Sequence, residues 1–205
     1  MKNKNKVCKP TGFIKPYNSL EKIPTIVMPK ETDLYRIVTD DPDNWHLVAN
    51  RPIARGELFT VLDVSSLIDV HDVEFIDIIL EETQERKRVY TAVYAVPSNA
   101  SCVSDTLEIP WCFMNHSCEP NTYDQWDAEN PAEFRSIKNI IVGEELTYDY
   151  NKEQYDYRSP FECQCGNELC RGMICGFKGL CSEEQKLLLS QASPFVQEKY
   201  WRTSI

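Results

Sequence analysis

The sequence lacks any apolar run near the roughly 18 residues that span a membrane, and it contains no internal repeat and no low-complexity tract. It is also short of positive charge, because 22 Lys and Arg stand against 32 Asp and Glu, for a net charge of −10. This deficit argues against a general nucleic-acid binder, which presents a basic face. An acidic surface suits a basic peptide substrate, although it is more often only a solubility feature.

The sequence also lacks a secretory segment, because no apolar stretch follows the basic residues 1–6. We therefore expect an intracellular protein of the cytoplasm or nucleus, in a thiol-reducing compartment without structural disulfides. With 205 residues the chain can bury a core of its own, so its cysteines are not needed to stabilise a small fold.

Nine cysteines are present, an odd number, and three of them follow the spacing Cys163-x-Cys165-x4-Cys170. This spacing suits a metal better than disulfides, and a closed structural zinc site needs four ligands in a tetrahedron. The alternative is a set of buried free thiols that pack as small apolar groups. Spacing favours Cys175 as the fourth ligand, but the choice stays open among these residues: Cys175, Cys181, Cys112 and Cys118.

Short runs rich in β-branched and apolar residues predict a mainly β chain with few helices. The expected strands are residues 34–38, 46–49, 58–62, 89–96 and the start of 134–142. Residues 72–82 fit either a helix or a buried strand, and the charged residues 84–88 predict a turn. Prolines in residues 1–30 predict an arm without regular structure.

The clearest helix signal lies near the C-terminus. Ser182 is the expected N-cap, and Gln185 stands three residues later as in a capping box. Ser193 and Pro194 end this helix, and a second short helix is expected to run to Trp201. The apolar side chains of this segment are expected to pack on the core more readily than to form a dimer face.

Three blocks carry the chemistry. They are Asn-His-Ser-Cys-Glu-Pro-Asn at residues 115–121, Gly-Glu-Glu-Leu-Thr-Tyr-Asp-Tyr at 143–150, and the cysteine-rich residues 163–172. In this order the blocks resemble the SET-domain protein lysine methyltransferases with a post-SET tail, over roughly residues 45–177. The resemblance implies a mainly β fold of several small sheets with a pseudoknot, a post-SET zinc site and a C-terminal helical extension.

The resemblance also implies a division of the chain. The expected parts are an N-terminal arm (1–32), a SET domain (33–160), a post-SET zinc motif (161–178) and a helical extension (179–205). It implies S-adenosylmethionine as the cofactor and Zn²⁺ as a structural ion. It implies that Cys118, and not Cys175, is the fourth zinc ligand, together with Cys163, Cys165 and Cys170.

The implied catalytic residues are Tyr150, beside the reacting methyl group and amine, and Tyr148, which lines the lysine channel. A tyrosine at position 148 restricts the expected product to mono- or dimethyl-lysine. The implied cofactor-binding residues are Asn115, His116, Trp45, His46, Leu47 and Ile174. Tyr150 could also be a core tyrosine, an alternative that the surrounding motif outweighs. Ile174 is explained equally well as a core residue, and His116 is assigned no proton-transfer role.

The chain departs from the family pattern at three places, one of which is Cys112, where the family often has an arginine before Phe-x-Asn-His. The stretch from Asn44 to Leu47 has no glycine where a glycine-rich turn approaches the cofactor, and Leu62 stands where the family commonly has a channel tyrosine. A catalytically degenerate SET-like module that binds proteins is therefore the alternative. A third reading is a methyltransferase for a non-histone protein or a small amine. The expected partner is a protein or peptide carrying a lysine, such as a histone, with neither nucleic acid nor membrane.

Overall fold

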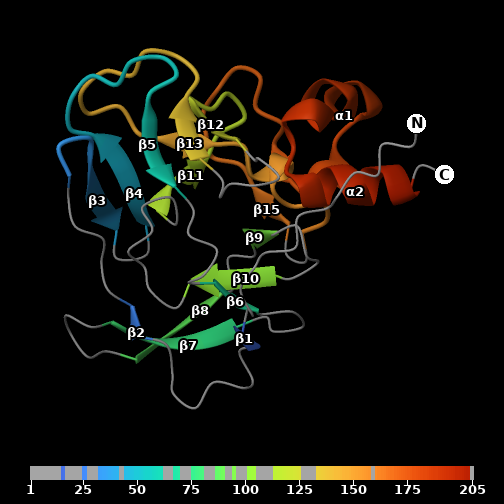
Figure 1. The fold of residues 1–205 in the computed structure, drawn as a ribbon, viewed down its shortest axis with the longest axis horizontal. Helices are drawn as coiled ribbons and strands as arrows, with labels where there is room; N and C mark the ends of the chain where they lie inside the picture. The colour runs from blue at the N-terminus through green and yellow to red at the C-terminus, as the bar shows by residue number, and fades with distance from the viewer. Residues whose placement is uncertain are drawn as a thin grey trace, which may run out of the picture.

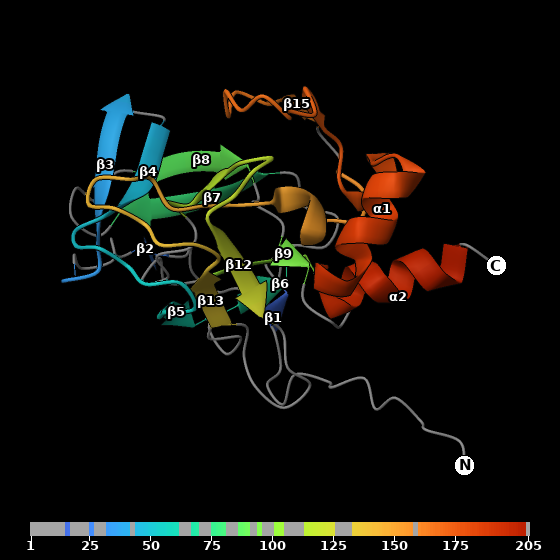
Figure 2. The same cartoon turned by 90° about the horizontal axis from the view of Figure 1, so that it is seen from above.

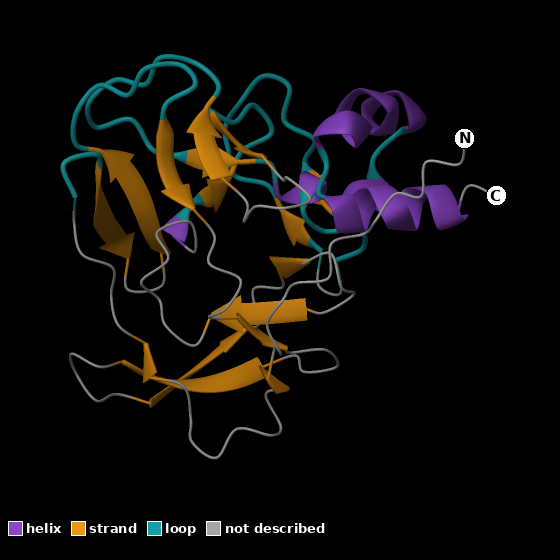
Figure 3. Ribbon diagram, viewed as in Figure 1, coloured by secondary structure: helices purple, strands orange, loops and turns teal. Residues whose placement is uncertain are grey.

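The structure is a computed structural model. It describes residues 15–16, 25–26, 32–41, 44–61, 67–69, 75–80, 86–90, 94–95, 101–104, 113–125, 133–157 and 160–203. Small sheets of two to four strands provide most of the regular secondary structure in this part of the chain. Figure 1 shows β3 and β4 at one side of the molecule and the helices α1 and α2 at the other. Figure 3 shows the same separation of strands and helices by colour.

Strands β3 (Tyr35–Asp41) and β4 (Asn44–Ala49) form an antiparallel hairpin, which confirms strands at residues 34–38 and 46–49. The buried Leu47 accepts a backbone hydrogen bond from Leu146, and Ala49 donates one to Glu144. These bonds attach the hairpin to the loop that carries the second block. The hairpin is therefore a direct support of residues 143–150.

A three-stranded sheet lies next to this hairpin. Its order is β12 (Thr122–Gln125), β13 (Glu133–Ser136) and β5 (Leu58–Val61), all antiparallel. Phe59 and Phe134 pack with ring centroids 6.2 Å apart and form part of its buried face. The predicted strand at 58–62 is confirmed where it is described, and so is the strand at the start of 134–142, which ends before Ile137.

Two further sheets lie below in Figure 1. Their orders are β1-β6-β10-β9 and β2-β7-β8. The bounds are β1 (Lys15–Pro16), β6 (Leu67–Asp69), β10 (Ser101–Ser104), β9 (Tyr94–Ala95), β2 (Thr25–Ile26), β7 (Phe75–Leu80) and β8 (Arg86–Tyr90). The ambiguous segment at 72–82 is thus a strand where it is described.

Two predictions from the sequence are wrong here. Residues 84–88 were expected to form a turn, but β8 begins at Arg86 and pairs with β7, which places Arg88 opposite Asp77. Local charge does not reveal such a cross-strand partner. Residues 1–30 were expected to lack regular structure, yet they contribute β1 and β2. Pro16 is tolerated because β1 is an edge strand, where a missing N–H is not needed.

The C-terminal part contains two helices. Helix α1 (Ser182–Leu188) is followed by a 3₁₀ turn, η6 (Leu189–Gln191), and by α2 (Pro194–Thr203). The predicted break at Ser193 and Pro194 is confirmed. The predicted cap is one residue too late, because Cys181 is the N-cap and the Glu184 carboxylate accepts from its N–H at 3.0 Å.

Both helices pack on a small apolar cluster. Its buried members are Phe177, Ala192 and Val196, and partly buried side chains surround them. The 3₁₀ turn η5 (Phe177–Gly179) brings Phe177 into this cluster. Figure 2, seen from above, shows α1 and α2 crossing at the same end of the molecule. Within the described ranges, no helix has the length and apolar character to cross a membrane.

Candidate functional site

The first two blocks lie side by side. Strand β11 (Asn115–His116) pairs in parallel with β14 (Thr147–Tyr148). The buried Asn121 extends this contact, because its amide donates to the Glu145 carbonyl at 2.7 Å and accepts from the Thr147 N–H at 2.9 Å. An asparagine amide that both donates and accepts fixes the separation of the two segments.

The third block closes over this pair. A two-stranded sheet of β15 (Phe161–Glu162) and β16 (Met173–Ile174) holds it, and the Cys163 N–H donates to the Gly172 carbonyl at 2.7 Å. Residues of all three blocks line one cavity of about 820 Å³, a size typical of sites for small molecules. The three blocks singled out in the sequence therefore do form one site.

The cavity carries negative charge. Four carboxylates line it against one lysine, namely Glu119, Glu144, Glu145 and Glu162 against Lys138. Such a lining attracts positively charged ligands. Asn115 also lines it, and its Nδ2 donates to the Glu145 carboxylate at 2.9 Å. This bond orients the amide, so its Oδ1 is held in a defined direction.

The two predicted catalytic tyrosines are neighbours, with ring centroids 4.7 Å apart. Tyr150 lines the cavity, and its hydroxyl donates to the Met114 carbonyl at 2.8 Å. Tyr148 is buried, with its ring edge-on to Phe134, and it does not line the described cavity. The structure thus places one tyrosine at the cavity wall and the other directly behind it.

His116 connects Tyr150 to the cysteines. Its Nδ1 accepts from the Tyr150 backbone N–H at 3.1 Å, so the neutral ring carries its proton on Nε2, which lies 3.3 Å from Cys118 Sγ. Burial lowers the pKa of His116, the charge of Asp149 opposes this effect and that of Arg171 adds to it, so that the pKa is about 4. The imidazole is therefore neutral at physiological pH and serves as a bridge.

The cysteine cluster combines two blocks. One sulfur comes from the first block and three from the third, and the Sγ atoms of Cys118, Cys163, Cys165 and Cys170 all lie within 4.8 Å of one another. Cys118 and Cys163 are 3.7 Å apart, and a tetrahedron with zinc–sulfur bonds of about 2.3 Å has edges of about 3.8 Å. The donor set therefore fits Zn²⁺.

The surroundings of the cluster act differently on its thiols, because burial raises the pKa of Cys118 and Cys163. Burial raises the pKa of Cys165, but hydrogen bonds with the backbone of Cys118 and Asn167 outweigh it and bring the pKa to about 6. The backbone N–H of Arg171 lies 3.4 Å from Cys118 Sγ. Cys175, which spacing alone favoured, is described but lies outside the cluster, and Cys112 lies outside the described residues. Zinc binding itself stays a prediction.

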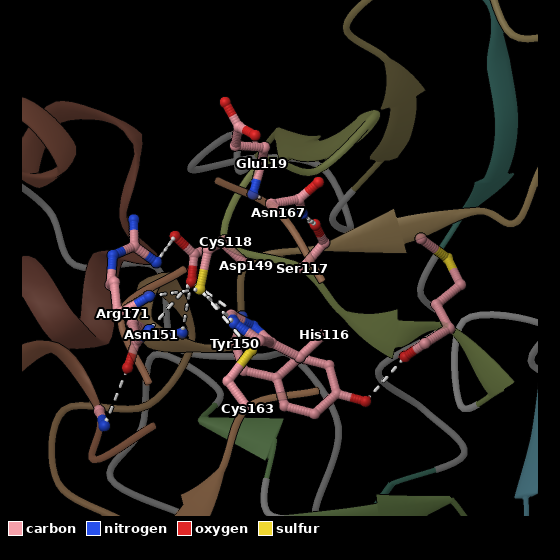
Figure 4. A network of polar contacts seen from close by, with 12 residues as sticks. His116, Ser117, Cys118, Glu119, Asp149, Tyr150, Asn151, Cys163, Asn167 and Arg171 are labelled. Carbon is pink, nitrogen blue, oxygen red and sulfur yellow. Dashed lines mark hydrogen bonds and ion pairs between the residues drawn. The ribbon is translucent and has the colours of Figure 1, made fainter. Parts of the chain in front are cut away.

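Sequence reasoning assigned no role to Asp149 and Arg171, which form an ion pair at 2.8 Å beside the cluster. Figure 4 shows both residues converging with His116 and Cys118. Asp149 is buried, and it also accepts from the Asn151 N–H at 3.1 Å. The position of Asp149 between two tyrosines in the sequence could have indicated a buried ion pair, because a buried carboxylate requires a partner.

The remaining predicted cofactor residues lie elsewhere. Trp45, His46 and Leu47 belong to β4 and do not line the cavity described here. Leu47 and Ile174 are fully buried in the core. Leu62 lies outside the described residues. The cofactor roles of these residues stay predictions.

Comparison with known proteins agrees with this architecture. The family model for the SET domain matches residues 44–151. The chain belongs to the SET-domain family. That match confirms the predicted fold class, a mainly β SET fold with a cysteine cluster and a helical extension.

Several relatives are similar to this SET domain over part of their length. Methyltransferase flvH of Aspergillus flavus is 34% identical over 92 residues, which are 44% of this chain and 48% of that protein. The H3 lysine-36 specific histone-lysine N-methyltransferase of Schizosaccharomyces pombe is 42% identical over 67 residues, covering 31% of this chain and 8% of that protein. The chain thus spans about half of the first relative and under a tenth of the second.

A solved structure is also similar. The methyltransferase domain of human histone-lysine N-methyltransferase SETMAR shares 17% identity and a TM-score of 0.44, over 69% of this chain and 58% of that one.

Proposed function

We propose that this SET domain is an S-adenosylmethionine-dependent methyltransferase that acts on a protein lysine. The observation that carries the proposal is the acidic cavity that all three blocks line and that Tyr150 borders. The relatives named as methyltransferases, including the histone-lysine enzyme of S. pombe, support the same activity and suggest histones among the substrates.

The cavity suits this cofactor. S-adenosylmethionine carries a sulfonium and an ammonium, and it would supply the methyl group: the lysine nitrogen forms a bond to that carbon while the carbon–sulfur bond breaks. The oriented amide of Asn115 offers an acceptor for the ammonium, and Glu145 adds a negative charge beside it. These residues would hold the amino-acid end of the cofactor.

The protein's main task is to prepare the amine. A free lysine has a pKa of about 10.4, so it is protonated in neutral water and is not nucleophilic. A narrow, dry channel that aims the nitrogen lone pair favours the neutral amine and the attack. The Tyr150 hydroxyl and the Met114 carbonyl, joined at 2.8 Å, form a polar group at this end of the cavity. The lysine proton leaves to solvent.

The zinc cluster would hold the third block over the cavity. Cys118 comes from the block that contains Asn115, and the other three cysteines come from the tail, so one ion would join both walls. Tyr148 lies behind Tyr150, and its hydroxyl takes up space that a more methylated amine needs. We therefore expect mono- or dimethylation.

A protein-binding module without turnover is the second candidate. It is favoured by Asn44 to Leu47, which have no glycine and do not line the cavity. Cofactor binding separates the two readings, because a degenerate module need not retain S-adenosylmethionine.

The test is methyl transfer from labelled S-adenosylmethionine to a panel of core histones, other basic proteins, the protein itself and small amines. Tyr150→Phe is expected to lower transfer on the order of 100-fold, as when one positioned catalytic group is removed. Tyr200→Phe removes a hydroxyl on α2, away from the cavity, and is the matched control. Absent cofactor binding by calorimetry, together with no transfer, would favour the binding module.

A further inference from the structure

The C-terminal helix α1 reaches the site through one arginine. Arg171 donates from Nη1 to Asp149 at 2.8 Å and from Nε to Glu184 of α1 at 3.0 Å. Its own backbone N–H points to Cys118 Sγ at 3.4 Å. One residue thus contacts the helical extension, the turn that carries Tyr150, and the metal cluster.

The ion pair between Arg171 and Asp149 is largely buried. The Asp149 side chain is 2% exposed and that of Arg171 is 15% exposed, whereas Glu184 is 34% exposed. A buried carboxylate requires a cation, and the Arg171 guanidinium lies 2.8 Å from the Asp149 carboxylate. Arg171 therefore neutralises Asp149, and Glu184 holds the second edge of the planar guanidinium so that it cannot swing to solvent.

Backbone contacts link the extension to the same turn independently. The 3₁₀ turn η4 (Tyr150–Lys152) is capped by Asp149. The Ser193 N–H donates to the Lys152 carbonyl at 2.9 Å, just before α2, and the Gly176 N–H donates to Asn151 Oδ1 at 3.0 Å. The extension thus contacts η4 through Ser193, and the segment just before the extension contacts η4 through Gly176.

We propose that Glu184 and Arg171 are positioning residues through which helix α1 fixes the Tyr150 turn and Cys118. The C-terminal extension is then part of the working site and not only a cover for the apolar cluster around Phe177. The effect on turnover rests on the proposed methyltransferase activity, but the mechanical link to residues 149–157 does not.

The test compares Glu184→Gln with Glu183→Gln in the full-length protein as purified. Both changes remove one negative charge from the first turn of α1, and Glu183 is exposed, whereas Glu184 holds Arg171. Hydrogen exchange of residues 149–157 measures the turn directly. We expect Glu184→Gln to speed this exchange roughly 10-fold and to lower kcat roughly 10-fold, because about one charge-assisted hydrogen bond is lost. The KM for the cofactor should change less.

A double-mutant cycle shows whether Glu184 acts through the arginine. In an Arg171→Lys background the Glu184→Gln change should have little further effect on exchange or kcat. The reason is that the planar guanidinium, which binds both the Asp149 and the Glu184 carboxylates, is already absent. Additive effects would overturn the proposal, as would equal exchange in the two glutamine variants or an unchanged kcat despite faster exchange. A wild type that neither binds S-adenosylmethionine nor transfers a methyl group would overturn the proposed function. The ratio of the exchange rates in the two glutamine variants would still support or overturn the link.

Discussion

Replacing Cys118 with serine removes the one sulfur that the first block contributes to the cluster, while the three sulfurs of the tail remain. The tail would then keep a partial site that is no longer joined to the cavity wall. Cys175→Ser is the matched control, because Cys175 is a described cysteine outside the cluster.

The expected loss follows from the number of ligands. Structural zinc sites bind with about 10–16 kcal/mol, so an equal share for each of four ligands is about 2.5–4 kcal/mol. This share corresponds to a roughly 70- to 1,000-fold weaker affinity for zinc. The Sγ atoms of Cys118 and Cys163 are 3.7 Å apart, which already matches the edge of a zinc–sulfur tetrahedron. Zinc binding therefore needs little rearrangement of the protein, and the loss of Cys118 should cost its whole share of the binding free energy.

The assay is a zinc competition titration with a chromogenic chelator, together with the zinc content of the purified proteins and calorimetry with S-adenosylmethionine. Cys118→Ser should lower zinc affinity by the stated factor and weaken cofactor binding with it, since the tail no longer closes the cavity. A wild type without zinc, an unchanged affinity in Cys118→Ser, or an equal loss in Cys175→Ser would refute the assignment.

Three other changes have defined outcomes. Tyr148→Phe should allow trimethyl-lysine in the mass spectrum of the product, because it removes the hydroxyl behind Tyr150; a wild type that already trimethylates would contradict this. Burial lowers the pKa of His116 from 6.5 to about 4, so the unfolded chain binds a proton between these pH values that the folded chain does not. The free energy of unfolding of the metal-free protein should therefore be highest above pH 6.5 and fall by up to about 3 kcal/mol toward pH 4. In denaturant titrations, the free energy of unfolding of His116→Gln should depend less on pH than that of the wild type. An equal pH dependence in both proteins would show that His116 is not its cause. Gly176→Ala should lower the free energy of unfolding by about 2 kcal/mol more than Gly166→Ala does. Both glycines have positive φ, but of these two only Gly176 would place a Cβ 3.0 Å from three backbone atoms. Equal unfolding midpoints of the two variants would contradict this.

Local patterns in the chain were enough for several elements and for the family. The strands at 34–38, 46–49 and 58–62 follow from β-branched and apolar runs, which interact with neighbours in any sheet. The break at Ser193 and Pro194 could be read because a proline marks a helix boundary, and α2 begins at Pro194, where the missing N–H is not needed. The three blocks were readable because the chemistry of each depends on residues close together in the sequence.

Contacts between distant segments could not be read in this way. Spacing alone favoured Cys175 over Cys118, because a count along the chain does not measure the distance between segments 45 residues apart. Strand β8 begins at Arg86, inside the turn expected at 84–88, because β7 pairs with it. The helix cap lies at Cys181 because Glu184 serves both that cap and Arg171. Residue types and their spacing thus indicate which groups are available, whereas packing selects which of them meet, since hydrogen bonds and metal bonds act only over a few ångströms.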